Sequence, residues 1–181
     1  MRFDPEKYHR RSIRLQYYDY ASPGYYFVTV CCHYRECLLG DVVGGAMKLN
    51  EYGRVVQLAW QWLDEQYDHV GLDTFIVMPN HLHGIIILTG ESRGDSRCRD
   101  DSRIGPTYKR KPLGRLVGAF KTVSTKQINK IRNTPGERVW QRNYYEHVVR
   151  DENELKKIRE YIINNSCKWE MDRNHPDNIK M

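Results

Sequence analysis

The sequence predicts an α+β protein with the ferredoxin-like split βαβ arrangement. We expect an antiparallel sheet of four to five strands with helices on one face, followed by a C-terminal helix. Strand-like and helix-like segments follow one another in the order β-α-β-β-α-β, and two of the strands are separated only by Pro79-Asn80. The 181 residues contain no internal repeat and suffice for one core, so we expect a single domain over residues 1–181.

Four segments have the β-branched and aromatic composition of strands. The first covers residues 24–32. Residues 72–78 and 81–88 form the second and third, and the short break between them predicts that they pair antiparallel. The fourth covers residues 144–150.

Three segments show apolar residues at helical spacing. The first helix is expected to begin after Asn50, whose side chain is a good N-cap. The second is expected over about residues 113–132. The third begins at Asp151, which forms a sequence resembling a capping box with Glu154.

Two histidines on the third predicted strand form the first candidate site. Side chains alternate between the two faces of a strand, so His81 and His83 point to one face and Leu82 points into the core on the other. Two imidazoles side by side are suitable metal ligands. A structural role for the histidines is the alternative.

The third predicted helix supplies the second candidate site. Tyr161 and Asn165 are separated by four residues and therefore lie on one face of a helix. A histidine pair and a tyrosine together suggest attack of a tyrosine on a phosphodiester. Tyr161 could instead border the apolar stripe of its helix, and Tyr144 and Tyr145 are rival tyrosines.

Positive charge is concentrated in one part of the chain. The net charge is +6 and the isoelectric point is about 9.0. Residues 93–132 hold 12 Lys and Arg against 3 Asp and Glu, whereas the rest of the chain is slightly acidic. This segment includes a polar loop at about residues 90–112, and its composition favours nucleic acid as the partner. A solvated loop that serves solubility is the alternative.

The remaining composition excludes a membrane protein and a disulfide scaffold. No apolar stretch approaches the roughly 18–20 residues that a membrane span needs, and the first residues lack the apolar region of a signal peptide. The five cysteines fit no zinc-site spacing, and we expect reduced thiols. We expect a soluble, cytoplasmic protein.

Four segments in this order resemble the REP-associated tyrosine transposases of the single-tyrosine HUH (IS200-like) transposase superfamily. They are residues 24–29, residues 77–83 with the HUH motif His81-Leu82-His83, residues 140–152 and residues 161–165. The resemblance extends over most of the chain. It differs at Ser166, where many relatives have proline.

The resemblance implies a role for each matching residue. His81 and His83 correspond to metal ligands, Tyr161 to the nucleophile, and Asn165 to the residue that completes the metal site. It implies Mg²⁺ or Mn²⁺ as the cofactor and nicking of single-stranded DNA beside a REP-like hairpin through a 5′-phosphotyrosine. It also implies a monomer or a homodimer.

The basic segment supplies the residues that we expect to contact DNA, namely Lys109, Arg110, Lys111, Arg115, Lys121 and Lys126.

Two other functions stay open. One is a hairpin-binding protein without catalytic activity on the same fold. The other is a zinc-dependent hydrolase that uses His81, His83 and His147.

Overall fold

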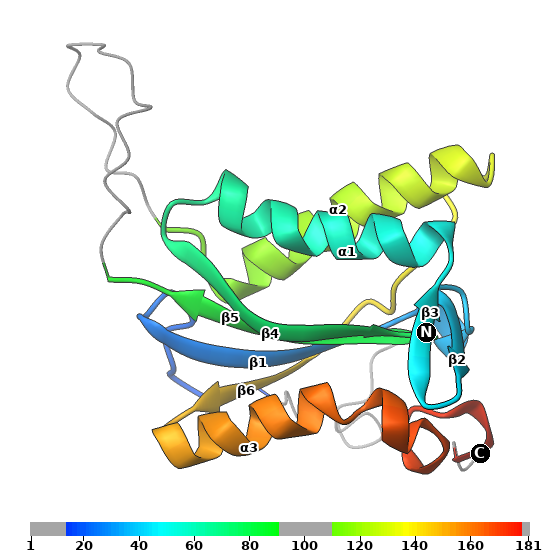
Figure 1. Cartoon of the computed structure of the whole chain (residues 1–181). Helices are drawn as coiled ribbons and strands as arrows, with labels where there is room; N and C mark the ends of the chain where they lie inside the picture. The colour runs from blue at the N-terminus through cyan, green and yellow to red at the C-terminus, as the bar shows by residue number, and fades with distance from the viewer. Residues whose placement is uncertain (1–13, 91–109, 179–181) are drawn as a thin grey trace, which may run out of the picture.

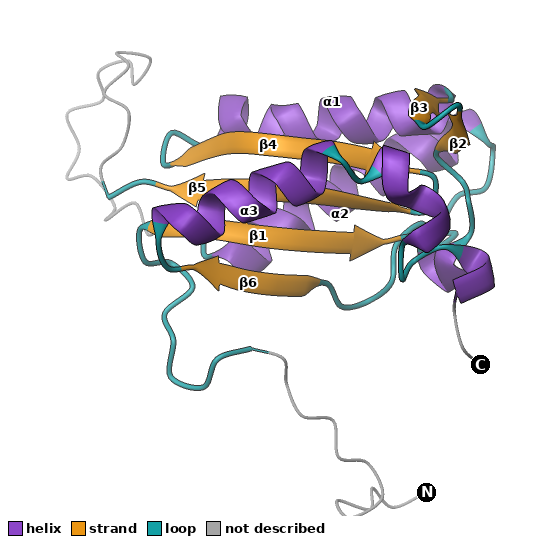
Figure 2. Cartoon of the chain, turned by 60° about the horizontal axis from the view of Figure 1, so that its bottom comes forward, coloured by secondary structure: helices purple, strands orange, loops and turns teal. Residues whose placement is uncertain are grey.

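The computed structural model describes residues 14–90 and 110–178. Four antiparallel strands form the main sheet in the order β4-β5-β1-β6 (Figure 2). They are β1 (Gly24–Cys31), β4 (Val70–Met78), β5 (His81–Leu88) and β6 (Tyr145–Val149). The split βαβ order confirms the predicted fold class.

Helices cover both faces of this sheet. The helices α1 (Glu51–Gln66) and α2 (Leu113–Ile131) pack on one face, and α3 (Glu152–Ile163) lies on the other (Figure 1). The larger core lies under α1 and α2, where Trp60 and Phe120 meet edge to face. A smaller cluster, which consists of Phe27, Ile85, Leu155 and Ile162, holds α3 against the sheet.

Two predicted helix starts have the expected caps. The Asn50 side chain accepts a hydrogen bond from the Gly53 N–H at 2.9 Å, and the Asp151 carboxylate accepts one from the Glu154 N–H at 2.9 Å. Each cap satisfies one of the N–H groups that a helix start leaves without a partner. These caps fix where the first and third helices begin.

A small hairpin between β1 and α1 was absent from the sequence prediction. It consists of β2 (Gly40–Val43) and β3 (Ala46–Leu49). Gly44 and Gly45 join the two strands with φ of 59° and 76°. Positive φ at both central residues matches the turn type that joins two-residue hairpins, and glycine adopts it without strain.

Three further features complete the description. The chain continues after α3 through the 3₁₀ segments η2 (Ser166–Met171) and η3 (Pro176–Asn178). Most of the predicted polar loop, residues 91–109, lies outside the described residues. Within the described ranges, no helix has the length and apolar character that crossing a membrane requires.

Candidate metal and tyrosine site

The alternation of side chains along β5 separates the histidines from the core under α1 and α2. Leu82 belongs to that core, whereas His83 stacks on Phe27 on the α3 face, with ring centroids 5.5 Å apart. His81 lies on the same face and contacts His83, as the sequence predicted. Both histidines are fully buried, because Tyr161 from α3 and Trp169 from η2 lie against them.

Asn80 determines which nitrogen of His81 carries the proton. The Asn80 Nδ2 donates to the carbonyls of Arg35 at 3.1 Å and Asn174 at 2.7 Å. The Asn80 Oδ1 is therefore the atom that faces His81 Nδ1, 2.8 Å away, and it accepts the proton of that nitrogen. The lone pair of His81 is thus on Nε2. In metal sites, an acceptor that bonds to one ring N–H of a histidine leaves the other nitrogen for the metal in the same way.

His83 is held in the same way by the neighbouring strand. Its Nδ1 forms a hydrogen bond of 2.8 Å with the hydroxyl of Thr29 on β1. The two Nε2 atoms of His81 and His83 then face each other 2.9 Å apart. Burial lowers the pKa of His81 to about 4 and holds the pKa of His83 well below its usual value, so both imidazoles are neutral.

Asp172 is the third member of the cluster and comes from the segment after η2. Its ligand atom and those of His81 and His83 all lie within 4.8 Å of one another. Its carboxylate accepts hydrogen bonds from the Asn174 N–H at 2.6 Å and from Asn165 Nδ2 at 2.9 Å. Asp172 is only 8% exposed and forms no ion pair with a cationic side chain of the described residues.

Asn165 joins the cluster through its amide. Because Nδ2 donates to Asp172, Oδ1 is left as a free acceptor. That oxygen is buried and has no hydrogen-bond partner in the structure. A buried amide oxygen without a partner is costly unless a cation or a donor occupies the space beside it.

These four residues suit a divalent cation. Two nitrogens that bind one ion at about 2.1 Å each, at right angles, would be about 3.0 Å apart, close to the 2.9 Å observed here. A buried carboxylate without a cationic partner and an orphaned amide oxygen both favour positive charge in the cluster. Neutral imidazoles together with oxygen ligands accept Mn²⁺, Mg²⁺ or Zn²⁺.

Tyr161 brings a hydroxyl to this cluster. Its oxygen is 3.2 Å from His83 Nε2, and its ring meets that of His83 with centroids 5.2 Å apart. Burial and the Asp172 charge raise the pKa of Tyr161, whereas Arg173 lowers it. The side chain is still 43% exposed, so the site reaches solvent at the tyrosine.

Tyr144 and His147 lie away from the histidine pair, whereas Tyr145 borders the site through Phe27. Tyr144 bonds to Arg14 and lies close to Gly114 at the start of α2, away from the histidines. Tyr145 packs against Phe27 and lies under the guanidinium of Arg173. His147 binds Glu154 at 2.7 Å, so the third donor beside the histidine pair is Asp172.

An ion pair anchors the tyrosine-bearing helix to the sheet. Arg159 on α3 binds both carboxylate oxygens of Asp73 on β4, with Nη2–Oδ2 at 2.6 Å and Nε–Oδ1 at 3.1 Å. The Arg159 guanidinium, with help from Thr74, lowers the pKa of Asp73 below its usual value of 3.8. The stabilisation is therefore present above about pH 4 and is lost as the pH falls through the folded pKa.

We expect a double-mutant cycle of Asp73→Asn and Arg159→Gln to give a coupling free energy of about 1 kcal/mol at pH 7, because the pair is bidentate but partly exposed. Urea unfolding should show this coupling shrinking below pH 4. Glu152→Gln is the control, since Glu152 touches Arg159 at 3.4 Å but is 82% exposed. A coupling that stays constant with pH would mean that the Asp73 charge does not hold the helix.

The residues predicted to contact DNA are spread along α2 and the segment before it. Arg110 donates to the Gly90 carbonyl, and Lys111 lies over the Tyr67 ring, 4.6 Å from its centroid. Arg115 and Lys126 are exposed on α2. Lys109 lies outside the described residues.

Lys121 differs from the other predicted DNA contacts. Its ammonium donates to the carbonyls of Gln141 at 2.8 Å and Asn143 at 3.0 Å, and burial lowers its pKa to about 8. This lysine therefore holds the segment after Trp140 against α2. A DNA contact by Lys121 stays a prediction, but its ammonium already has partners.

Comparison with known proteins adds two likenesses. A protein of Haemophilus influenzae strain Rd, described as uncharacterized, is 40% identical over 175 residues, which cover 94% of this chain and 95% of that protein. The structure of a REP-associated tyrosine transposase bound to a REP hairpin superposes with a TM-score of 0.56, covers 88% of this chain and 74% of the other, and is 18% identical. No family model matches the chain. At 18% identity the second likeness shows the fold.

Proposed function

Because the chain belongs to the same family as the Haemophilus influenzae protein and has the fold of the REP-associated tyrosine transposases, we propose that it is a metal-dependent endonuclease and strand transferase of single-stranded DNA. It would act in DNA transposition and cut beside a hairpin. The structural neighbour was solved with a REP hairpin, which supports a REP-like palindrome as the partner.

One observation carries the proposal: a tyrosine hydroxyl lies 3.2 Å from a buried histidine pair that shares its cluster with a carboxylate and an orphaned amide oxygen. A phenol with a pKa of about 10 is a weak nucleophile by itself, and here burial raises that pKa further. The site thus needs a positive charge beside Tyr161.

His81, His83, Asp172 and Asn165 would hold a divalent ion, Mg²⁺ or Mn²⁺. When bound, the ion supplies a Lewis acid that polarises and orients a phosphate group. Burial keeps the two imidazoles neutral, and the hydrogen bonds of Thr29 and Asn80 turn them toward the cluster. The packing of α3 on Phe27 and Ile85 holds Tyr161 above the ligands.

Tyr161 would carry the covalent step. Its hydroxyl oxygen attacks the phosphorus, the bond between phosphorus and the 3′ oxygen breaks, and the phenol proton is balanced by the one that the leaving 3′ oxygen takes up. The products are a 5′-phosphotyrosine and a free 3′-hydroxyl. The ester bond is conserved, so the same tyrosine could rejoin strands without ATP.

The test uses oligonucleotides that carry a hairpin with single-stranded flanks. We expect a protein–DNA adduct that survives denaturing electrophoresis in Mn²⁺ and is absent in EDTA. Binding without an adduct would favour a hairpin-binding protein with no catalytic activity. Hydrolysis that leaves no adduct would favour a hydrolase, although His147 is bound to Glu154 and not to the cluster.

Substitution of Asn80 tests whether its hydrogen bond to His81 supports metal binding. Asn80→Ala removes the acceptor of the His81 Nδ1 proton, so His81 can turn or change tautomer. We expect Mn²⁺ affinity to fall about 10–100-fold, measured by calorimetry, because loss of a residue that hydrogen-bonds to a metal ligand has an effect of this size. The control is Asn164→Ala, whose side chain donates to the Glu160 carbonyl within α3. Equal Mn²⁺ affinities in the Asn80 variant and the wild type would contradict the assignment.

A further inference from the structure

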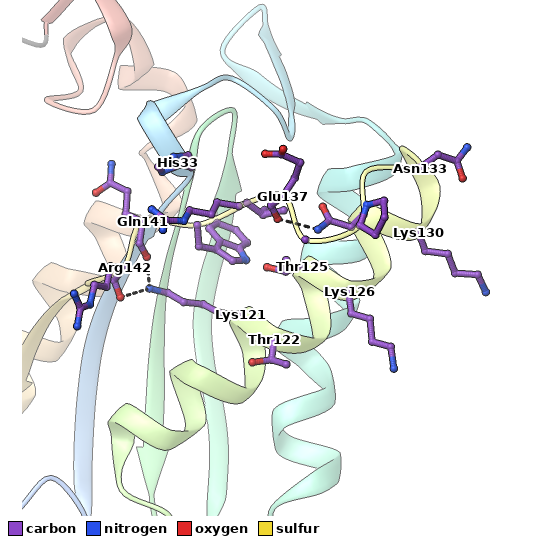
Figure 3. A pocket seen from close by; sticks show the side chains of 16 residues that line it. His33, Lys121, Thr122, Thr125, Lys126, Lys130, Asn133, Glu137, Gln141 and Arg142 are labelled. Carbon is purple, nitrogen blue, oxygen red and sulfur yellow. Dashed lines mark hydrogen bonds between the residues drawn. The ribbon is translucent and has the colours of Figure 1, made fainter.

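A groove lies on the α2 side of the sheet, away from the metal and tyrosine site. It runs between the second half of α2 and residues 133–142, and it encloses about 1360 Å³. Figure 3 shows Lys126 and Lys130 at one side of this groove, and Arg142, Gln141 and His33 at the other. This volume exceeds the roughly 300–1,000 Å³ of small-molecule sites, so a polymer is a better match than a metabolite.

The two walls of the groove are joined by a hydrogen bond, and its lining is strongly basic. Asn129 on α2 donates to the Glu137 carbonyl at 2.8 Å and thereby fixes the opposite wall. Lysines and arginines dominate the charged lining, with Glu137 as its single acid; the four exposed ones are Lys126, Lys130, Arg138 and Arg142. Within the described part of the chain, none of these four forms an ion pair. They are therefore available for phosphate groups.

The segment that lines the groove pairs with the strand next to the first histidine of the metal cluster. Trp140 forms a β-bridge with Cys32, and the Gln141 N–H donates to the Cys31 carbonyl at 2.9 Å. Cys31 in turn pairs with His81 across the β1–β5 ladder. One strand thus separates this segment from the first histidine of the metal cluster.

Two neighbouring aromatic residues, the partly buried His33 and the exposed Tyr34, lie at the groove. The His33 ring lines the groove and contacts the Tyr34 ring in a tilted arrangement, with centroids 4.0 Å apart. Tyr34 is 82% exposed, and both Tyr34 and Arg35 have positive φ, at 52° and 56°. Two consecutive non-glycine residues in this strained region point to a function for the exposed ring. The Arg35 carbonyl accepts from Asn80, which ties this turn to the histidine pair.

We propose that this groove binds the phosphate backbone of the single-stranded DNA that flanks the cleaved bond, and that Tyr34 stacks on a base where the strand passes from the groove to the metal cluster. The choice of DNA as the ligand rests on the proposed function. The position of the DNA strand rests on the charge of the groove, on the pairing of its wall with the β-strand next to His81, and on the exposed ring of Tyr34. Aromatic rings interleaved with a basic track are typical of single-strand binding.

The salt dependence of binding tests whether the groove contacts the phosphate groups of DNA. The probe is a fluorescent oligothymidylate of about 20 nucleotides, which forms no hairpin, measured by anisotropy in EDTA so that cleavage plays no part. Each lost phosphate contact to a single strand flattens the slope of log K against log salt by about 0.7. We therefore expect Lys126→Gln with Lys130→Gln to bind more weakly and to flatten the slope by about 1.4.

The matched control removes the same charge elsewhere. Lys48→Gln with Arg54→Gln neutralises two exposed cations on β3 and α1, away from the groove lining. We expect its slope to equal that of the wild type. If the groove pair and this control give the same slope, or if the wild type does not bind the probe, the groove is not a DNA path.

Tyr34 is tested by a change that leaves the salt slope alone. Tyr34→Ala should weaken binding about tenfold with an unchanged slope, because stacking involves no counterion release, and Tyr34→Phe should bind as the wild type does. Thermal unfolding should be similar in all three proteins, since the ring is exposed. Equal affinities of the Ala and Phe variants would overturn the stacking role. If no adduct forms in Mn²⁺, the proposed cleavage is contradicted, but the binding measured in EDTA still decides whether the groove binds single-stranded DNA.

Discussion

Tyr161→Phe should form no covalent adduct with hairpin DNA, while it binds that DNA with the affinity of the wild type. The change removes only the hydroxyl oxygen that lies 3.2 Å from His83 Nε2. The ring contacts with Phe27 and His83 stay, so α3 should keep its position on the sheet. Denaturing electrophoresis measures the adduct, which should fall to background, and anisotropy measures the affinity.

Tyr144→Phe and Tyr145→Phe are the matched controls for this experiment. Each removes one hydroxyl from a tyrosine that bonds to Arg14 or lies under Arg173. Both variants should form the adduct. If Tyr161→Phe still cleaves and one of these variants does not, the nucleophile has been assigned to the wrong residue.

His81→Ala and His83→Ala should each abolish cleavage and weaken Mn²⁺ binding at least 100-fold. Each variant removes one of two nitrogens that face each other at 2.9 Å and leaves the other histidine, Asp172 and Asn165 as donors. Loss of a direct ligand should lower Mn²⁺ affinity by more than the 10–100-fold expected when a residue that hydrogen-bonds to a ligand is lost. Calorimetric titration with Mn²⁺ provides the affinity.

The histidines are buried, so their removal also leaves cavities, and a stability measurement has to separate the two effects. Mn²⁺ at 100 times its dissociation constant should stabilise the wild type by about 2.7 kcal/mol, or raise its melting temperature by about 5–10 °C. The variants should unfold cooperatively in EDTA and gain no such increase from Mn²⁺. Variants that lack a thermal transition in EDTA would indicate a structural role, and an undiminished Mn²⁺ increase would place the metal elsewhere.

Local signals made most of the fold predictable. The alternation His81-Leu82-His83 fixed the faces of β5, and the caps at Asn50 and Asp151 fixed where two helices begin. These signals depend on neighbours in the sequence, so they survive without tertiary information. The β2–β3 hairpin was missed because its strands have four residues each, although the Gly44-Gly45 pair was a usable turn signal.

The candidate site was predictable only in part. The structure brings Tyr161 and Asn165 to the histidine pair, but their chemical roles stay predictions. Asp172 was missed because it follows an irregular 3₁₀ segment and has no periodicity that would assign it to a face. Its carboxylate reaches the histidines only because Trp169 and its neighbours fold back over them.

The residues of the proposed DNA path were also predictable only in part. The charge of residues 93–132 was visible in the sequence, but the groove also uses Arg138 and Arg142, which come from a separate segment. Hydrogen bonds of Lys121, Ser124 and Asn129, together with the packing of Trp140 on Phe120, bring that segment against α2. Summed charge along a chain therefore located one wall of the groove and could not locate the other.

The most direct test of a tyrosine nucleophile is the mass of the peptide that carries the DNA. After reaction with hairpin DNA in Mn²⁺, nuclease treatment and trypsin should leave a nucleotide on the peptide of residues 160–168, whose single tyrosine is Tyr161. The peptide of residues 143–150, which holds Tyr144 and Tyr145, should be unmodified, and EDTA should abolish the product. A nucleotide on residues 143–150, or an adduct formed equally in EDTA, would contradict the account.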